Sequence, residues 1–172
     1  MTNGYDSAEG RHNFFERLVN KIPGLKSYQE RETRREVDKM QRDWLAGEID
    51  RARQGVQKKV RKWTRKGNLQ NLDIASSLEK LLDRFANRIR HADYGYTGFF
   101  DAVKIRSDEL AMIYEFDLKL SETVEDFANK IENLPLEADE DALDDLLVAI
   151  EDADRAFDDR STIFEDVTKK GA

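Results

Sequence analysis

The sequence predicts an all-α protein, an elongated antiparallel bundle of four main helices plus a short N-terminal amphipathic helix. Apolar residues recur every three or four positions in the structured stretches, and no stretch alternates apolar and polar residues as a strand would. Charged residues make up 38% of the 172 residues, which suits long helices with solvated faces. The predicted connections at 67–71, 93–98 and 134–138 are short, which favours antiparallel neighbours.

The first predicted helix covers 13–22 and ends at Pro23-Gly24. The second covers 27–66, where Ser27 and Glu30 form a capping box that opens the helix. Gly67 follows two basic residues and closes it.

A straight helix over 27–66 would be about 60 Å long, against about 40 Å for a compact globule of this chain length. The molecule is therefore elongated, or this helix bends. Gly47 and Gly55 are the two candidate positions for a bend, and the sequence does not decide between a straight and a broken helix.

The second half of the chain predicts a helix at 72–93, a short helical piece at 98–105, a long helix at 108–133 and a last helix that begins at 139–141. Asp117 falls on the apolar seam of the long helix, and we expect Phe116 beside it to fill that place. The sequence therefore predicts a single helical domain at 13–167, with flexible tails at 1–12 and 168–172.

Composition excludes several classes of site. The chain has no cysteine, which rules out disulfides, thiolate metal sites and a cysteine nucleophile, and fits the cytoplasm. No signal peptide is apparent, and the longest apolar run, "LLVAI" at 146–150, is too short to span a bilayer. The sequence predicts no enzyme activity, no catalytic residue, no cofactor and no metal ligand.

The net charge of −7 conceals two regions of opposite sign. Residues 11–66 hold 17 basic and 8 acidic side chains, a net of +9, whereas residues 101–166 hold 6 basic and 22 acidic, a net of −16. Such regions attract each other even across water. We therefore expect the basic segment to lie beside the acidic one, either within the chain or between copies. The acidic balance disfavours nucleic acid as a partner.

Two stretches carry a family resemblance. "IPGLKSYQERETRREVDK" (22–39) is one, and "RIRHADYGYTGFFDAVKI" (88–105) with "YEFDLKL" (114–120) is the other. Together they resemble a widespread group of uncharacterised bacterial helical proteins. The resemblance implies a helical fold and a bacterial source. It implies no established activity and transfers no catalytic residue.

An aromatic window between 94 and 100 could be a ligand groove or the cap of the bundle, and we favour the cap because buried aromatics contribute much to a small core. Its candidate surface consists of His91, Tyr94, Tyr96, Phe99 and Phe100. His91 and Asp93 could exchange a proton, but no nucleophile is marked beside them. No small-molecule substrate is identified.

Two further surfaces are candidates for contact with a partner. The basic run at 58–66 surrounds Trp63 and offers Lys58, Lys59, Arg61, Lys62, Arg65 and Lys66. The amphipathic segment 13–26 offers Phe14, Phe15, Leu18 and Lys21 to a partner or to an anionic membrane surface. The structural alternative is that both segments fold against the rest of the chain.

The sequence thus predicts a non-catalytic, cytoplasmic interaction or scaffold protein. Charged helix faces, basic over 31–66 and acidic over 137–159, would bind a protein partner or another copy. The alternative is a protein held at the inner face of the membrane by segment 13–26.

Overall fold

Helices account for the secondary structure of the chain wherever the computed structural model describes it, over residues 14–25, 34–92, 107–135 and 137–171. The five helices are an N-terminal helix at 14–21, α3 (Arg34–Arg65), α4 (Leu72–His91), α6 (Ser107–Glu132) and α7 (Glu140–Gly171). No strand occurs in these ranges, which confirms the all-α class.

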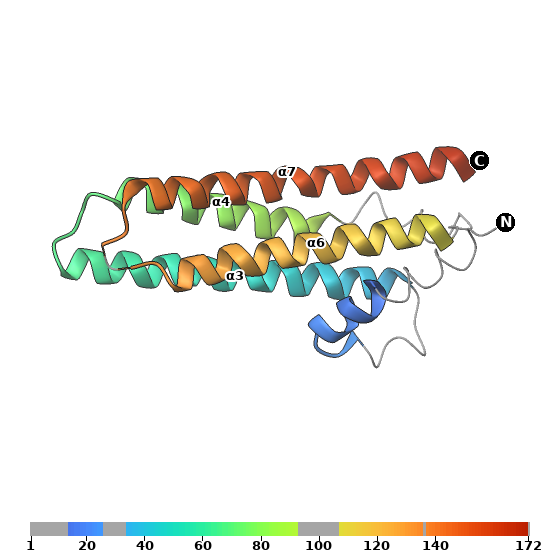
Figure 1. Ribbon diagram of the computed structural model, residues 1–172, viewed down its shortest axis with the longest axis horizontal. Helices are drawn as coiled ribbons and strands as arrows, with labels where there is room; N and C mark the ends of the chain where they lie inside the picture. The colour runs from blue at the N-terminus through green and yellow to red at the C-terminus, as the bar shows by residue number, and fades with distance from the viewer. Residues whose placement is uncertain (1–13, 26–33, 93–106, 136, 172) are drawn as a thin grey trace.

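The four long helices lie side by side as two hairpins, α3–α4 and α6–α7 (Figure 1). α3 packs against α4 and α6, and α7 packs against the same two helices. α3 and α7 therefore occupy diagonal corners of the bundle, and so do α4 and α6. The sequence favoured antiparallel packing across every short connection. The segment between α4 and α6 instead joins two helices at diagonal corners of the bundle. Antiparallel neighbours that are consecutive in the chain are therefore α3 with α4 and α6 with α7.

Most predicted boundaries agree with the observed ones to within two residues. The exceptions are at the ends. α7 continues to Gly171, whereas the sequence assigned 168–172 to a flexible tail. The capping box at Ser27, the helical piece at 98–105 and the tail at 1–12 lie outside the described residues.

Local signals end and begin the helices as predicted. Gly67, with φ of +74°, closes α3 in a Schellman motif, because the N–H of Asn68 donates to Trp63 O at 3.0 Å and the N–H of Gly67 to Thr64 O at 3.1 Å. At the start of α7, Asp139 Oδ1 accepts the N–H of Ala142 at 2.8 Å. Asn71 precedes α4, but its side chain donates instead to Ala138 O at 2.7 Å. That bond ties the two connecting segments together.

The apolar stripes predicted for each helix meet in one core. Its largest fully buried side chains include Trp63, Phe85 and Phe127, which come from α3, α4 and α6. Phe85 also contacts Phe157 of α7, with ring centroids 6.4 Å apart. The core thus joins the two hairpins over most of their length.

α3 passes through both candidate break points without interruption. A Cβ built on Gly47 would meet no atom within 4 Å, whereas one built on Gly55 would lie 3.0 Å from Ile131 Cγ2. Gly55 therefore marks a close approach of α3 to α6. Gly47 has no such contact, so its helix has room for a larger side chain there.

We expect the two glycines to respond differently to alanine. Gly47→Ala should raise the free energy of unfolding by about 0.5–1 kcal/mol, because alanine restricts the unfolded chain and favours the helix. Gly55→Ala should gain less or lose stability, because its methyl group presses on Ile131. Urea unfolding followed by circular dichroism measures both. Equal gains from the two variants would contradict the close approach.

Candidate functional site

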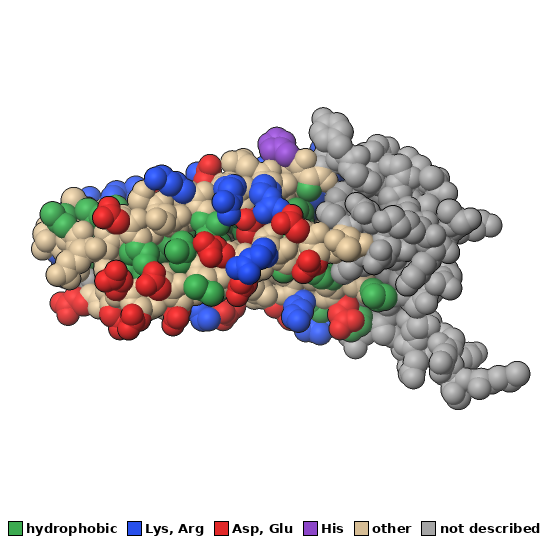
Figure 2. Space-filling model, turned by 90° about the horizontal axis from the view of Figure 1, so that it is seen from above, with side chains coloured by type: hydrophobic (Ala, Val, Ile, Leu, Met, Phe, Trp, Pro, Cys, Tyr) green, Lys and Arg blue, Asp and Glu red, His purple; other side chains and the backbone are tan. Residues whose placement is uncertain are grey.

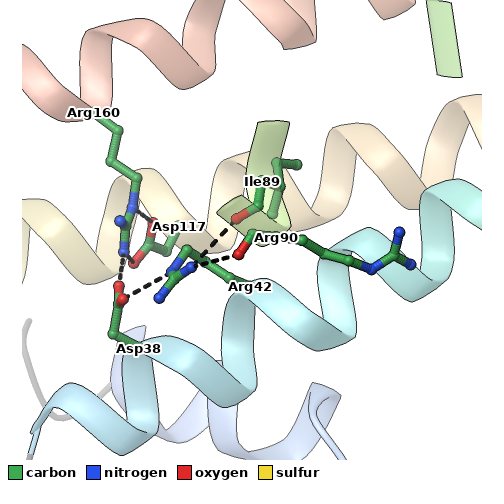
Figure 3. Close-up of polar contacts among 6 residues, drawn as sticks. All are labelled: Asp38, Arg42, Ile89, Arg90, Asp117 and Arg160. Atoms are coloured by element: carbon green, nitrogen blue, oxygen red, sulfur yellow. Dashed lines mark hydrogen bonds and ion pairs between the residues drawn. The ribbon is translucent and has the colours of Figure 1, made fainter. Parts of the chain in front are cut away.

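Four charged side chains form a buried cluster beside the first turns of α3 and the last turn of α4 (Figure 3). Asp38 and Arg42 come from α3, Asp117 from α6 and Arg160 from α7, and each residue is only 3–5% exposed. Unpaired charges at such burial would cost several kcal/mol each. The structure therefore has to balance them locally, and two arginines facing two aspartates do so.

Arg160 is the centre of this cluster. Its Nε donates to Asp117 Oδ1 at 2.6 Å, and its Nη2 donates to Asp117 Oδ2 at 3.0 Å, which is the bidentate geometry of strong arginine–carboxylate pairs. The same Nη2 donates to Asp38 Oδ1 at 2.7 Å. The contact to Asp38 links α7 to α3 across the diagonal of the bundle.

Arg42 extends the cluster to the fourth helix. Its Nε donates to Asp38 Oδ2 at 2.9 Å, and its Nη1 donates to the carbonyl oxygens of Ile89 and Arg90 at 3.3 Å. These carbonyls belong to the last turn of α4, where backbone acceptors have no partner within the helix. A cation there also opposes the negative end of the helix dipole. The four residues thus bond all four long helices to one another.

Sequence reasoning missed this cluster. We expected Phe116 to take the place of Asp117, yet Asp117 is buried and Phe116 packs only partly against the core. The signal was present, since Asp117 lies on the apolar seam of α6. Arg160 similarly continues the apolar face of α7, because it follows Phe157 by three residues and Phe157 follows Ala153 by four. A charged residue of each sign on two facing stripes indicates a buried pair.

The aromatic window lies outside the described residues, so Tyr94, Tyr96, Phe99 and Phe100 stay predictions. His91 is the last residue of α4 and is exposed. No group of three potential metal-ligating side chains occurs in the part of the chain that the structure describes.

The N-terminal helix lies against α6. Leu18 is 1% exposed, Phe14 and Phe15 are half-buried, and the Phe15 ring lies 4.9 Å from that of Tyr114. Arg17 pairs with Glu122 of α6, and Lys21 pairs with Glu125. The apolar face of this helix is therefore used within the fold, so Leu18 is not available as a contact residue in this arrangement. None of the described helices has the length and apolar character that crossing a bilayer requires.

The basic end of α3, comprising Lys58, Lys59, Arg61, Lys62, Arg65 and Lys66, is the predicted basic surface. All but Lys59 are exposed, and none of the six forms an ion pair with another described residue. Lys59 is half-buried and donates to Leu134 O. Burial lowers the pKa of Lys59, as does the charge of Lys62, while Glu132 opposes the shift.

A groove of about 640 Å³ runs between α3 and α6 beside this basic end. Lys58, Lys59 and Lys62 line one wall, and Glu132 of α6 lines the other, with Gly55 and Ile131 among the apolar lining. The groove is open and mixed in character.

The acidic start of α7, comprising Glu137, Asp139, Glu140, Asp141, Asp144 and Asp145, lies at the same end of the bundle. All six are exposed, and they too lack ion pairs with other described residues. Figure 2 shows acidic side chains gathered at the left of the visible face, the end that holds the connecting segments. The basic and acidic regions of the chain do meet elsewhere, since Arg17 and Lys21 pair with α6 and α3 packs against α6. The basic end of α3 and the acidic start of α7 form no ion pair with each other, because α3 and α7 occupy diagonal corners.

We expect removal of one partner from the buried cluster to be costly. Asp117→Ala should lower the free energy of unfolding by about 3–5 kcal/mol, because it leaves the Arg160 charge buried and under-compensated. The apolar double variant Asp117→Leu/Arg160→Met should recover most of that loss. Urea unfolding provides the measurement.

Asp126 is the matched control for this prediction, because it pairs with Lys130 on an exposed face of the same helix. Asp126→Ala should change stability by less than about 0.5 kcal/mol. If Asp117→Ala proved equally mild, the cluster would not be the stabilising constraint described here.

Comparisons with protein-family models, with curated proteins and with solved structures found no match to this chain. The resemblance to bacterial helical proteins therefore stays a prediction from the two sequence blocks.

Proposed function

We propose that this protein is a non-catalytic interaction or scaffold protein that binds a protein partner, or a second copy of itself, through charged helix faces. Its working form is an elongated bundle of antiparallel hairpins, with the N-terminal amphipathic helix against one side. The observation that carries the proposal is the placement of unpaired charge. Two surfaces of opposite sign share one end of the bundle without neutralising each other.

The rest of the bundle supports this contrast. Cross-helix ion pairs join Arg53 to Asp83, Arg90 to Asp50, and Arg88 to Asp154 and Asp158. Within the described residues, α3 makes no cross-helix ion pair beyond Arg53, and α7 makes none before Asp154. The charged residues beside the connecting segments 66–71 and 133–139 therefore lie outside this set of cross-helix ion pairs.

Unpaired charge of this kind favours association by long-range attraction. Complementary potentials raise the rate of encounter and fix orientation, and added salt weakens both effects. Lysine and arginine stems also cover apolar surface while their charged groups reach a partner. The basic end of α3 is thus suited to an acidic protein surface.

We expect capture of partners to depend on that surface. Tagged protein carrying Lys58→Gln/Arg61→Gln/Lys62→Gln should lose most of the proteins that the unaltered chain retains from an extract at low salt. The unaltered chain should also release them as salt is raised to about 0.5 M, where screening extends over only a few ångströms. Quantitative mass spectrometry of the eluates measures both effects.

The matched control removes charge elsewhere. Lys80 and Lys119 are exposed and lie outside the basic end, so Lys80→Gln/Lys119→Gln should retain the same partners. Partners that were insensitive both to salt and to the basic end would overturn the proposal.

The same proposal predicts no anchoring in lipid. Because the apolar face of the N-terminal helix packs within the fold, with Leu18 buried and the Phe15 ring beside Tyr114 of α6, the chain should stay at the bottom of a flotation gradient with anionic or neutral vesicles. Flotation with anionic vesicles that is lost in Phe14→Ser/Phe15→Ser, with helicity retained, would instead support the membrane-surface alternative.

A further inference from the structure

We infer that the partner of the charged end is a second copy of this chain, bound end to end so that each basic end of α3 meets the acidic start of the other copy's α7. This inference rests on the proposed function and names its partner. It follows from where the fold places the two surfaces, from their charge and from an exposed apolar residue at the same end of the bundle.

The two surfaces share one end but form no ion pair with each other within the described part of the chain. The connecting segments 66–71 and 133–139 are tied there by the Asn71 to Ala138 hydrogen bond and by Lys59, which donates to Leu134 O. The surfaces extend from these segments along α3 and α7, which are diagonal, so α4 and α6 lie between them. Their charges are therefore left for an external partner.

The chemistry of each surface fits the other. The basic end of α3 carries six cations over residues 58–66, and the acidic start of α7 carries six carboxylates over residues 137–145, with no lysine or arginine among residues 135–154. If the basic end of α3 met the acidic start of α7 on a second copy, the charges of the two surfaces would neutralise each other.

Symmetry allows both contacts to form at once. Two diagonal corners of one end are exchanged by a twofold axis that is perpendicular to the bundle and to the line joining the corners. Two copies related by that axis touch end to end, and each basic surface then faces the acidic surface of the other copy. Because both complementary surfaces are used, assembly closes at two copies.

Leu69 supplies the apolar part of the contact. It lies in the α3–α4 connection at this end and is 59% exposed, one of the few large apolar side chains with such exposure. Association by charge alone is weak and lacks register, whereas a buried apolar residue near the centre of an interface adds specificity. An end-to-end contact is small, so we expect a salt-sensitive dimer in exchange with the monomer.

Sedimentation equilibrium over a range of concentrations tests the inference. At low salt the mass should rise from that of one chain, 20.0 kDa, to twice that value and then stop. The variants Arg61→Glu/Lys62→Glu and Asp144→Lys/Asp145→Lys should each raise the dimer dissociation constant by at least about tenfold, because like charges then meet. An equal mixture of the two variants should restore the dimer, because their altered surfaces complement each other.

Controls separate this contact from the effect of net charge. Lys80→Glu/Lys119→Glu and Asp43→Lys/Glu115→Lys change net charge by the same amounts at exposed positions outside the two surfaces, and both should dimerise as the unaltered chain does. Thermal unfolding shows that every variant is folded before its mass is compared.

A chain that stays monomeric at low salt, a mass that grows beyond two copies, or a variant mixture that fails to associate would overturn the inference. If the chain were monomeric while capture of another protein still required the basic end of α3, the proposed function would stand and only its self-association would fall. If neither association nor charge-dependent capture occurred, both would fall.

Discussion

The buried contact between Arg160 and its two aspartates is the constraint on which the arrangement of the bundle depends. A guanidinium that is 3% exposed is tolerable only where carboxylates meet it in good geometry. Asp117 meets it from α6 and Asp38 from α3, so α7 can dock in one register with respect to both. Apolar stripes alone would allow a helix to slide by a turn at modest cost, whereas a slide here would separate three charges.

That constraint also explains why the charged surfaces face outward at the other end. The cluster links α3 to α7 across the diagonal of the bundle. Arg84 and Arg88 of α4 form ion pairs with α7 at Asp154 and Asp158. The acids of α7 before Asp154 form no ion pair with another helix of the described bundle. Their exposure follows from the packing order of the helices rather than from an excess of acid alone.

Much of this architecture could be predicted from the sequence, because its signals are local. Gly67 ends α3 where its left-handed φ is needed, and Asp139 caps α7 through its own side chain. The apolar steps through Phe85 and Phe127 identified the buried faces. These features depend on residues within a turn or two of one another.

The order in which the helices surround the core could not be predicted, because every apolar stripe would accept any other. The sequence therefore did not reveal that α4 and α6 are diagonal, or that Asp117 would find Arg160 43 residues away. The run of cations at 58–66 is visible in the sequence, and its role as a contact surface stays a prediction. That these cations form no ion pair with other described residues became visible only with the helix order in place.

The division of the buried cluster between the hairpins has a consequence for how the chain folds. The α3–α4 hairpin holds Arg42 with Asp38 and the α4 carbonyls, and the α6–α7 hairpin holds Arg160 with Asp117. Each hairpin thus contributes one arginine and one aspartate to the cluster, so these four residues bring no net charge into the interface between the hairpins. The bond from Arg160 to Asp38 crosses that interface, so it can form only once the two hairpins have met.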